Sequence, residues 1–242
     1  MVRVNDLAAS LEVTSVTIRT DLEHLERRGL AVRMHGGAVL PEHDELPRYI
    51  NNTVHENFEK KDAIARCALQ LVYPDATVII DAGSTAAIFS RRLHGYAVTV
   101  VTNSVPVIAE LVTDEHINLI ASGGAIRKPV KAMVGEIARW AYESIRADVV
   151  FLGASGYSLD QGVTTPNLLE ADTKRAMIDA AQTVCLLADS TKHEQVKFAK
   201  ICDWDRIDYF MTDSAPTDLI QGLEARGVTV VTPEYNGIHA RS

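Results

Sequence analysis

Residues 14–37 read TSVTIRTDLEHLERRGLAVRMHGG and form the most informative stretch of the chain. Ile18, Leu22 and Leu25 stand at positions i, i+4 and i+7, which is the spacing of an apolar stripe along one side of a helix. Thr14 is suited to cap the start of this helix, because its hydroxyl can accept a hydrogen bond from a free N–H of the first turn. The pattern therefore predicts a helix that begins directly after Thr14.

The residues on either side of this helix predict its neighbours. Gly29 is suited to end the helix as a left-handed cap. Residues 31–39 hold basic side chains beside the Gly36-Gly37 pair, which is typical of a two-stranded wing. A second, shorter helix joined by a turn near Val13 would complete a winged helix-turn-helix head over residues 1–40. Its apolar stripe consists of Val4, Leu7, Ala8 and Leu11.

Several polar side chains lie near the start of the longer helix and off its apolar stripe. From such positions, short hydroxyl side chains and arginine can reach the phosphates and base edges of DNA. The head holds five Arg and five Asp or Glu, so binding would require its cations to gather on one face. An ordinary amphipathic helix has the same periodicity, and the pattern alone leaves that alternative open. The candidate DNA contacts are Thr14, Ser15, Thr17, Arg19, Thr20, Arg33, His35 and Gly36.

The run VNDLAASLEVTSVTIRTDLEHLERRGLAVRMHGGAV resembles the DNA-binding head of the DeoR family of bacterial repressors. The recognition-helix pattern of that family corresponds to Val13–Leu22, and its Arg-x-His-Gly-Gly-Ala motif to Arg33–Ala38. Many relatives carry a second Arg at the position of Thr20, so we expect altered specificity or a weaker phosphate contact here. Another helix precedes the pair in the family, and the resemblance implies that the first helix of this head is missing.

The composition is that of a protein with a parallel sheet. The chain has 242 residues, 47% hydrophobic and 6% aromatic, which suits a small head and a larger body with a core of Val, Ile, Ala and Leu. The net charge of −8 belongs to the body, because 19 basic and 27 acidic residues follow residue 40. An acidic body repels DNA, so we expect the head to make the contact.

We expect a cytoplasmic protein that binds no metal and no cofactor. No apolar run reaches the roughly 18 residues of a membrane helix, and no signal-peptide pattern is present. Cys67, Cys185 and Cys202 lack metal or redox spacing, and the eight His form no cluster of ligands. The cysteines are therefore expected to be reduced thiols.

A polar, acidic connector with Pro41, Pro47 and the run EHDEL spans residues 41–58. The body, residues 59–242, alternates between apolar runs of strand length and segments with helical patterning. This alternation predicts an α/β fold with a mostly parallel sheet and helices on its faces. The expected strands are TVIID, VTVVT, INLIA, DVVFLG, TVCLLA, DYFMT and a second VTVVT. The expected helices are KKDAIARCALQLV, TAAIFSRRL, PVIAELV, GEIARWAYESI, LLEADTKRAMIDAA and DLIQGLEARG.

Small, hydroxylated or glycine-rich segments follow five of the expected strands. Parallel sheets bind ligands at the carboxyl ends of their strands, so these segments should converge on one edge. Glycines let backbone N–H groups approach an anion, and helix N-termini favour negative charge. The sequence therefore predicts an anion site built from Asp81–Thr85, Thr102–Ser104, Ser122–Gly124, Gly153–Gly156 and Asp189–Lys192.

Charged side chains near these segments suggest more specific roles. Arg127, Lys174 and Lys192 could neutralise a phosphate, whereas Asp81 and Asn103 could bind sugar hydroxyls. Plainer roles stay open: loops that only turn and cap, a solvated Arg127, an Asp81 that only braces loops, and an i+4 pair between Lys174 and Glu170. The candidate effector-binding residues are Asp81, Gly83, Ser84, Thr85, Thr102, Asn103, Gly123, Gly124, Arg127, Lys174 and Lys192.

The segments DAGST, VTNS, SGGAIRK, GVTTPNLLEADTKRAM and LLADSTKHE resemble the sensor domain of the DeoR family. The resemblance implies a fold similar to ribose-5-phosphate isomerase and an inducer that is a phosphorylated sugar or a related metabolite. It implies that Gly83, Ser84 and Thr85 hold the phosphate beside a helix N-terminus, and that the other candidates line the rest of the site. The pattern looks nearest to the branches that regulate hexosamine, glycerol phosphate or hexitol use.

Together these patterns predict a transcriptional repressor of a carbohydrate operon that binds operator DNA as a homo-oligomer, a dimer or a tetramer. Two alternatives stay open. An aldose–ketose isomerase needs a base near a carbon-bound proton, but Ser155 stands where isomerases of this fold carry an Asp, and Gln161 stands where they carry a Lys, so we expect no enzyme. A sugar-phosphate-binding protein that does not bind DNA is the other alternative.

Overall fold

The computed structural model describes residues 2–11, 13–27, 32–34, 36–39 and 57–235. The chain divides into two compact units, Met1–Tyr49 and Ile50–Ser242. The head lies in the first unit and the body in the second.

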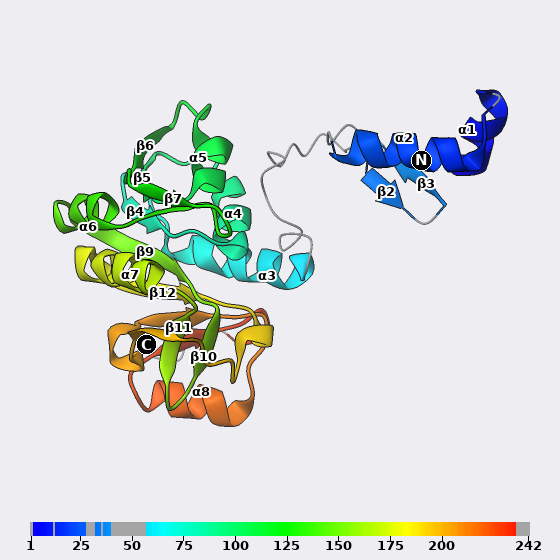
Figure 1. The fold of residues 1–242 in the computed structure, drawn as a ribbon. Helices are drawn as coiled ribbons and strands as arrows, with labels where there is room; N and C mark the ends of the chain where they lie inside the picture. The colour runs from blue at the N-terminus through cyan, green and yellow to red at the C-terminus, as the bar shows by residue number, and fades with distance from the viewer. Residues whose placement is uncertain (1, 12, 28–31, 35, 40–56, 236–242) are drawn as a thin grey trace. The chain divides into compact units, whose positions relative to one another are not determined.

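The head contains two helices and a small sheet (Figure 1). Helix α1 spans Val4–Ser10, and helix α2 spans Ser15–Arg27, as the apolar spacing predicts. Strands β1 (Val2–Arg3), β2 (Val32–Met34) and β3 (Gly37–Val39) pair antiparallel in the order β1-β3-β2. The predicted two-stranded wing is present, and β1 adds a third strand that the sequence reading missed.

The described side chains of the head pack around a small apolar core. The hydroxyl of Thr14 accepts a hydrogen bond from the backbone N–H of Thr17 at 3.1 Å, so the predicted N-cap is confirmed. Leu11 is 61% exposed, and its predicted place in the apolar stripe is wrong because α1 ends at Ser10. The core consists of Val4, Ile18, Leu22 and Ala38, with Leu7 and Ala8 packed against it.

Gly37 shows why glycine is needed in the wing. A Cβ atom at this position would lie 2.1 Å from the carbonyl oxygen of Val2, because β1 passes directly against β3. The expected cap at Gly29 and the position of His35 fall outside the described residues, as do the side chains of Leu25 and Arg33.

A seven-stranded sheet forms the centre of the body, in the order β15-β14-β12-β9-β4-β5-β6. Every neighbouring pair is parallel, which confirms the predicted α/β class. Its strands are rich in Val, Ile and Leu because a parallel sheet is covered on both faces. The strands are β4 (Thr77–Ile80), β5 (Val98–Thr102), β6 (Ile117–Ala121), β9 (Ala147–Gly153), β12 (Ala181–Leu187), β14 (Tyr209–Met211) and β15 (Thr229–Val231).

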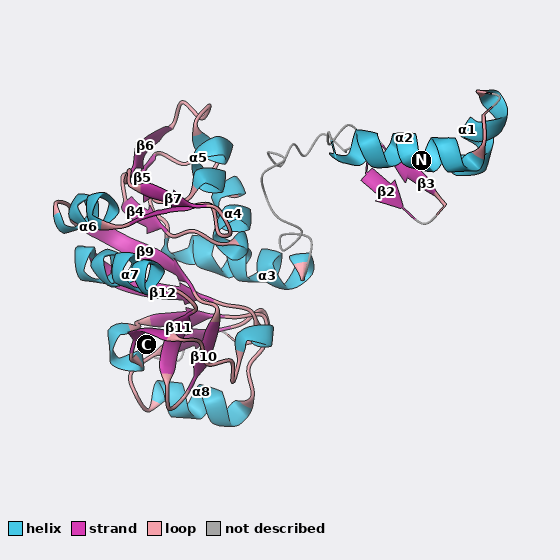
Figure 2. Cartoon of the chain, viewed as in Figure 1, coloured by secondary structure: helices cyan, strands magenta, loops and turns pink. Residues whose placement is uncertain are grey.

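Helices lie on both faces of this sheet, as Figures 1 and 2 show. Helices α3 (Phe58–Ala68), α4 (Ser84–Arg91) and α5 (Val105–Leu111) pack side by side on one face. Helices α6 (Glu136–Glu143) and α7 (Leu168–Ala180) pack together on the other. The last helix, α8 (Thr217–Glu224), packs against β15.

Two small antiparallel sheets are inserted between the main strands. One is the hairpin of β7 (Ala125–Arg127) and β8 (Ala132–Val134). The other joins β10 (Gly156–Ser158), β11 (Gly162–Thr165) and β13 (Ala199–Cys202). The sequence reading missed both because strands of three or four residues carry too few positions to show alternation. Short 3-10 turns span Leu69–Leu71, Ser190–Lys192 and Trp204–Arg206.

The core of the body combines aliphatic strands with a few large aromatic side chains. Phe89 on α4 and Phe151 on β9 lie with ring centroids 4.4 Å apart. Tyr157, Trp204 and Phe210 pack edge to face around the inserted sheet, and the indole N–H of Trp204 donates to the carbonyl of Ser158 at 2.8 Å. Within the residues that the structure describes, no helix combines the length and apolar character needed to cross a membrane.

Candidate functional site: the carboxyl edge of the body sheet

The five predicted loops all follow strands of the one parallel sheet and therefore lie at its carboxyl edge. Along this edge they stand in the order of β12, β9, β4, β5 and β6. Neighbouring strands lie about 4.8 Å apart, so the loops after β12 and β6 are separated by about 19 Å. One small ligand does not span that distance, and the loops after β9, β4 and β5 form the centre of the site.

A buried ion pair lies at this centre. The ammonium of Lys174 on α7 pairs with the carboxylate of Asp81 after β4, and the two residues are 6% and 1% exposed. Lys174 also donates to the carbonyl of Gly153 at 3.0 Å, and the N–H of Gly153 donates to Asp81 at 2.9 Å. The i+4 pairing of Lys174 with Glu170 is therefore not formed, since Asp81 takes the ammonium. The pair braces the loops after β4 and β9 against α7.

A second ion pair fixes the inserted hairpin to α7. The guanidinium of Arg127 on β7 donates to Glu170 at 2.5 Å, and the hydroxyl of Thr165 donates to the other carboxylate oxygen at 2.8 Å. Glu170 is 6% exposed, so its charge needs both partners. The solvated alternative for Arg127 is wrong, because its guanidinium already has a carboxylate partner.

The start of α4 is the open part of the edge. Gly83 precedes the helix with φ +152°, a conformation that favours glycine, and it is exposed. Among the described residues no side chain caps this N-terminus, whereas Ser104 caps α5 and Asn167 caps α7. Ser84 is half-buried and Thr85 is buried in the first turn. The uncapped N–H groups of α4 are thus available to an anion.

The loop after β5 lies beside this helix start. Asn103 is 2% exposed, and its amide donates to the carbonyl of Met133 at 3.2 Å. Among the described residues no hydrogen-bond donor reaches its Oδ1. Thr102 uses its hydroxyl internally, as a donor to Ile80 at 2.6 Å and an acceptor from Ser104 at 3.0 Å. Asn103 is therefore the residue of this loop with unused capacity.

The glycines after β6 have a packing role. Gly123 and Gly124 have φ +72° and +114°. A Cβ atom on Gly124 would lie 2.7 Å from the carbonyl of Val134, because β8 passes close by. These glycines let the β7–β8 hairpin fold back on the sheet and bring Arg127 toward α7.

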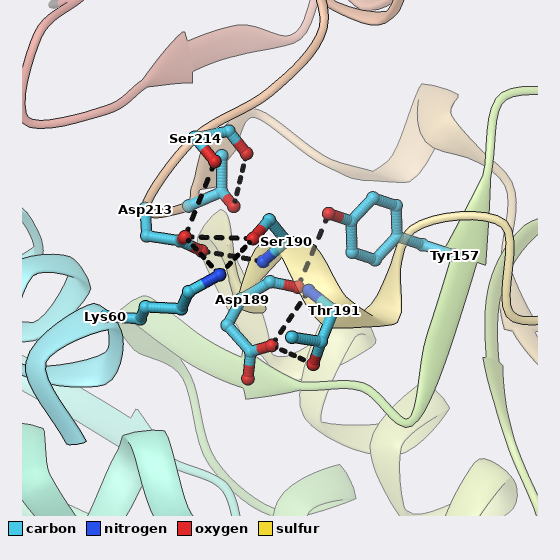
Figure 3. Close-up of polar contacts among 8 residues, drawn as sticks. Lys60, Tyr157, Asp189, Ser190, Thr191, Asp213 and Ser214 are labelled. Atoms are coloured by element: carbon cyan, nitrogen blue, oxygen red, sulfur yellow. Dashed lines mark hydrogen bonds and ion pairs between the residues drawn. The ribbon is translucent and has the colours of Figure 1, made fainter. Parts of the chain in front are cut away.

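The loop after β12 carries Lys192 in the 3-10 turn Ser190–Lys192. Lys192 is half-buried, and within the described part of the chain no carboxylate lies within ion-pair distance of it. Ser190 donates hydrogen bonds to Asp213 (Figure 3). Asp189 accepts hydrogen bonds from Thr191 and Tyr157. Asp213, which follows β14, was missed by sequence reasoning; its only sequence signal is its place directly after an expected strand.

In the head, the predicted contact residues of α2 lie on its solvent side. Thr17, Arg19 and Thr20 are exposed, and Ser15 is half-buried. The hydroxyls of Thr14 and Thr20 are engaged within the helix, the first with Thr17 and the second with the carbonyl of Val16 at 3.1 Å. Gly36 is exposed with φ +83° in the wing.

Val16 is a candidate DNA contact that the sequence reading missed. It is 65% exposed between Ser15 and Thr17 and faces away from the core of Ile18 and Leu22. An exposed valine on a recognition helix can contact the methyl group of thymine. The signal was available, because Val16 breaks the apolar spacing of the buried stripe.

Comparison with known proteins gives the family. Residues 1–44 match the DeoR-like helix-turn-helix domain, and residues 56–214 match the DeoR C terminal sensor domain. Among solved structures, the chain is similar to ribose 5-phosphate isomerase A of Methanocaldococcus jannaschii, with a TM-score of 0.43 and 19% identity over 57% of this chain and 55% of that one. A likeness of this size carries no argument about function.

Relatives of higher similarity are named as regulators of transcription and not as enzymes. The putative aga operon transcriptional repressor of Escherichia coli O157:H7 is 34% identical over 95% of this chain and 87% of its own length. The transcriptional regulator GlpR of Haloferax volcanii is 35% identical over 94% and 90% of the two chains. The L-fucose operon activator of Haemophilus influenzae is 31% identical over 90% and 88%. The chain belongs to the DeoR family of DNA-binding transcriptional regulators, which confirms the family expected from its motifs.

Proposed function

We propose that this protein represses a carbohydrate-utilisation operon in the cytoplasm and that a phosphorylated sugar bound at the carboxyl edge of the body sheet controls its affinity for the operator. The observation that carries the proposal is the uncapped start of α4 beside the unpartnered Oδ1 of Asn103. The first suits a phosphate, and the second suits a hydroxyl donor. A sugar phosphate supplies both groups in one small molecule.

The charges of the site support a ligand with one phosphate. Arg127 and Lys174 already pair with Glu170 and Asp81, so neither is a free counter-charge. Lys192 has no such partner among the described residues. In the proposed complex the helix start binds the phosphate, Asn103 binds a sugar hydroxyl, and the side chain of Lys192 approaches from the side of β12, with Thr102 at the wall of the site.

Relatives support the choice of a carbohydrate operon and leave the sign of regulation to experiment. One relative is named as an aga operon repressor and another as an L-fucose operon activator. We propose repression relieved by the sugar phosphate, with a dimer or a tetramer as the active form. One short recognition helix gives low affinity, and paired heads are the usual solution for this motif.

The alternative of an isomerase finds little support in the site chemistry. Isomerisation needs a carboxylate or similar base that is free to accept a proton. The carboxylates of Asp81 and Glu170 are held in buried ion pairs, and Ser155 stands where a base would be needed. Accumulation of ketose from an aldose phosphate would establish the enzyme reading in place of ours.

The test is a thermal-shift measurement with glucosamine 6-phosphate, glycerol 3-phosphate and sorbitol 6-phosphate, each paired with its unphosphorylated form. We expect one phosphorylated compound to raise the melting temperature and its unphosphorylated form to leave it unchanged. The same compound should release the protein from operator DNA that the protein itself selects from a random-sequence library. Selection of no DNA would favour the sensor that does not bind DNA, and equal shifts by both forms would contradict the phosphate site.

A further inference from the structure

The first turn of α3 lies at the same edge of the sheet as the effector loops. Residues 41–58 join the head to the body, and α3 begins at Phe58. The helix leads through the turn Leu69–Leu71 into β4, which runs toward the carboxyl edge. A helix that precedes a parallel strand runs in the opposite direction, so α3 starts at the carboxyl edge. The connector to the head therefore enters the body beside the proposed ligand site.

Lys60 joins this first turn to the loops after β12 and β14. Its ammonium donates to the hydroxyl of Ser190 at 2.8 Å and lies 3.2 Å from the carboxylate of Asp213 (Figure 3). Asp213 in turn accepts from the backbone N–H of Ser190 at 2.6 Å and from its hydroxyl at 2.9 Å. The three residues come from three separate elements, and each contacts the other two.

The Ser190 turn is itself held as a rigid unit. The carboxylate of Asp189 accepts from the N–H of Thr191 at 3.0 Å, and the N–H of Lys192 donates to the carbonyl of Asp189 at 3.0 Å. The hydroxyl of Tyr157 reaches the same carbonyl at 3.5 Å. Because Ser190 and Lys192 belong to one 3-10 turn, a ligand that moves the backbone of Lys192 also moves Ser190.

The carboxylate of Asp213 is charged under ordinary conditions. Burial raises the pKa of Asp213, but hydrogen bonds from Ser190 and Lys60 outweigh burial and hold it below its usual value. The side chain of Asp213 is 10% exposed, whereas that of Lys60 is 40% exposed. An ion pair with one such exposed partner adds little to stability. The contacts among Lys60, Ser190 and Asp213, called the link below, therefore contribute little to the stability of the ligand-free fold.

We propose that Lys60 and Asp213 are positioning residues that transmit the state of the effector loop Asp189–Lys192 to the first turn of α3, where the connector to the head begins. This proposal rests on the proposed function and names its route of regulation. Ligand binding at Lys192 shifts the Ser190 turn, and the shift changes the contact with Lys60 and so the position of the first turn of α3. A pair that served only to stabilise the fold would leave the effect of the ligand on DNA binding unchanged.

The test uses the full chain with Lys60→Met, Asp213→Asn and the double variant. The matched control is Lys200→Met, which breaks an exposed pair with Asp203 elsewhere on the body. Operator affinity is measured with and without each of the three phosphorylated compounds. Allosteric ligands commonly change affinity by about 5- to 150-fold, and we expect the two variants to reduce that ratio to about 2-fold or less. Operator affinity without ligand should stay at the wild-type value in the variants and in the control. Variants that keep the wild-type ratio would overturn the link.

A second measurement decides the link without any ligand. Asp213→Asn should raise amide hydrogen exchange several-fold in residues 188–193 and also in residues 58–64. Lys60→Met should likewise raise exchange in both segments. Lys200→Met should change neither segment. If Asp213→Asn leaves amide hydrogen exchange in the first turn of α3 unchanged, the link is absent. If the link is seen but none of the three compounds binds, the proposed function fails while the link stands.

Discussion

Lys174 of α7 pairs with Asp81 of the loop after β4, and the two side chains are 8% and 1% exposed although 93 residues separate them in sequence. The sequence reading assigned Lys174 to phosphate and Asp81 to sugar hydroxyls. The structure gives each group the other as its partner. The pair therefore fixes the shape of the edge, and in the proposed complex the phosphate binds at the helix start and near Lys192.

The first prediction concerns this buried pair. Lys174→Met leaves the carboxylate of Asp81 buried without its counter-charge, and breaking such a pair costs about 3–5 kcal/mol. Denaturant unfolding of the variant should show a loss of this size. The double variant Lys174→Met with Asp81→Asn keeps an acceptor for the N–H of Gly153 and should recover most of the loss. Equal stability of the single and double variants would show that the charge is not the cause.

The second prediction separates the two cations that flank the site. Lys192→Ala should weaken binding of the phosphorylated ligand by about 1.5–3 kcal/mol, the range of a charge-assisted contact, and should leave the melting temperature nearly unchanged. Arg127→Ala should instead lower the melting temperature of the ligand-free protein, because it removes the partner of the buried carboxylate of Glu170. Thermal shift with and without ligand measures both effects. Normal ligand binding by Lys192→Ala would remove Lys192 from the site, and an unchanged melting temperature of Arg127→Ala would show that its pair with Glu170 does not stabilise the fold.

The sequence predicted the layout of the body better than its contacts. The regular alternation of apolar strands and helices gave the parallel sheet, and the topology placed the five loops at one edge. The ion-pair partners could not be predicted in the same way. The i+4 spacing suggested a pair between Lys174 and Glu170, but Glu170 pairs with Arg127. Arg127 lies on β7, a strand of three residues that is too short to be recognised from its sequence pattern. Lys60 and Asp213 were missed for the same reason, since contacts between distant elements leave no local period.

The third prediction concerns pH and the opposite edge of the sheet. His94 after α4 contacts Glu110 at 3.1 Å and Asp114 at 2.8 Å. The hydrogen bond with Glu110 is the largest cause that raises the pKa of His94, and it outweighs burial. Backbone hydrogen bonds from His116 and Gly95 lower the pKa of Asp114 from 3.8 to about 2.

The sign of the pH effect follows from these directions. A raised histidine pKa stabilises the fold fully below the ordinary value of 6.5, and the contribution is lost as pH rises through the raised value. The contribution of Asp114 is present above 3.8 and is lost as pH falls toward 2. Melting curves from pH 5 to 9 should therefore lose stability more steeply in the wild type than in His94→Gln. If the stabilities of the wild type and His94→Gln fall in parallel with pH, His94 does not titrate in this contact. As a control, ligand binding at the carboxyl edge should be the same in the wild type and in His94→Gln.

The last prediction concerns the recognition helix. Arg19 is exposed on α2, so Arg19→Ala should leave the head folded and cost roughly 1–3 kcal/mol of operator affinity. Arg66→Ala is the matched control, since it removes an exposed arginine from the body. The kind of contact can be read from the salt dependence. If Arg19 binds a base, the variant loses discrimination at one operator position, whereas a phosphate contact lowers affinity for all sequences and reduces the salt slope by about 1. An operator affinity equal to that of Arg66→Ala would exclude Arg19 from the interface and leave Ser15, Val16, Thr17 and Thr20 as the candidate contacts on α2.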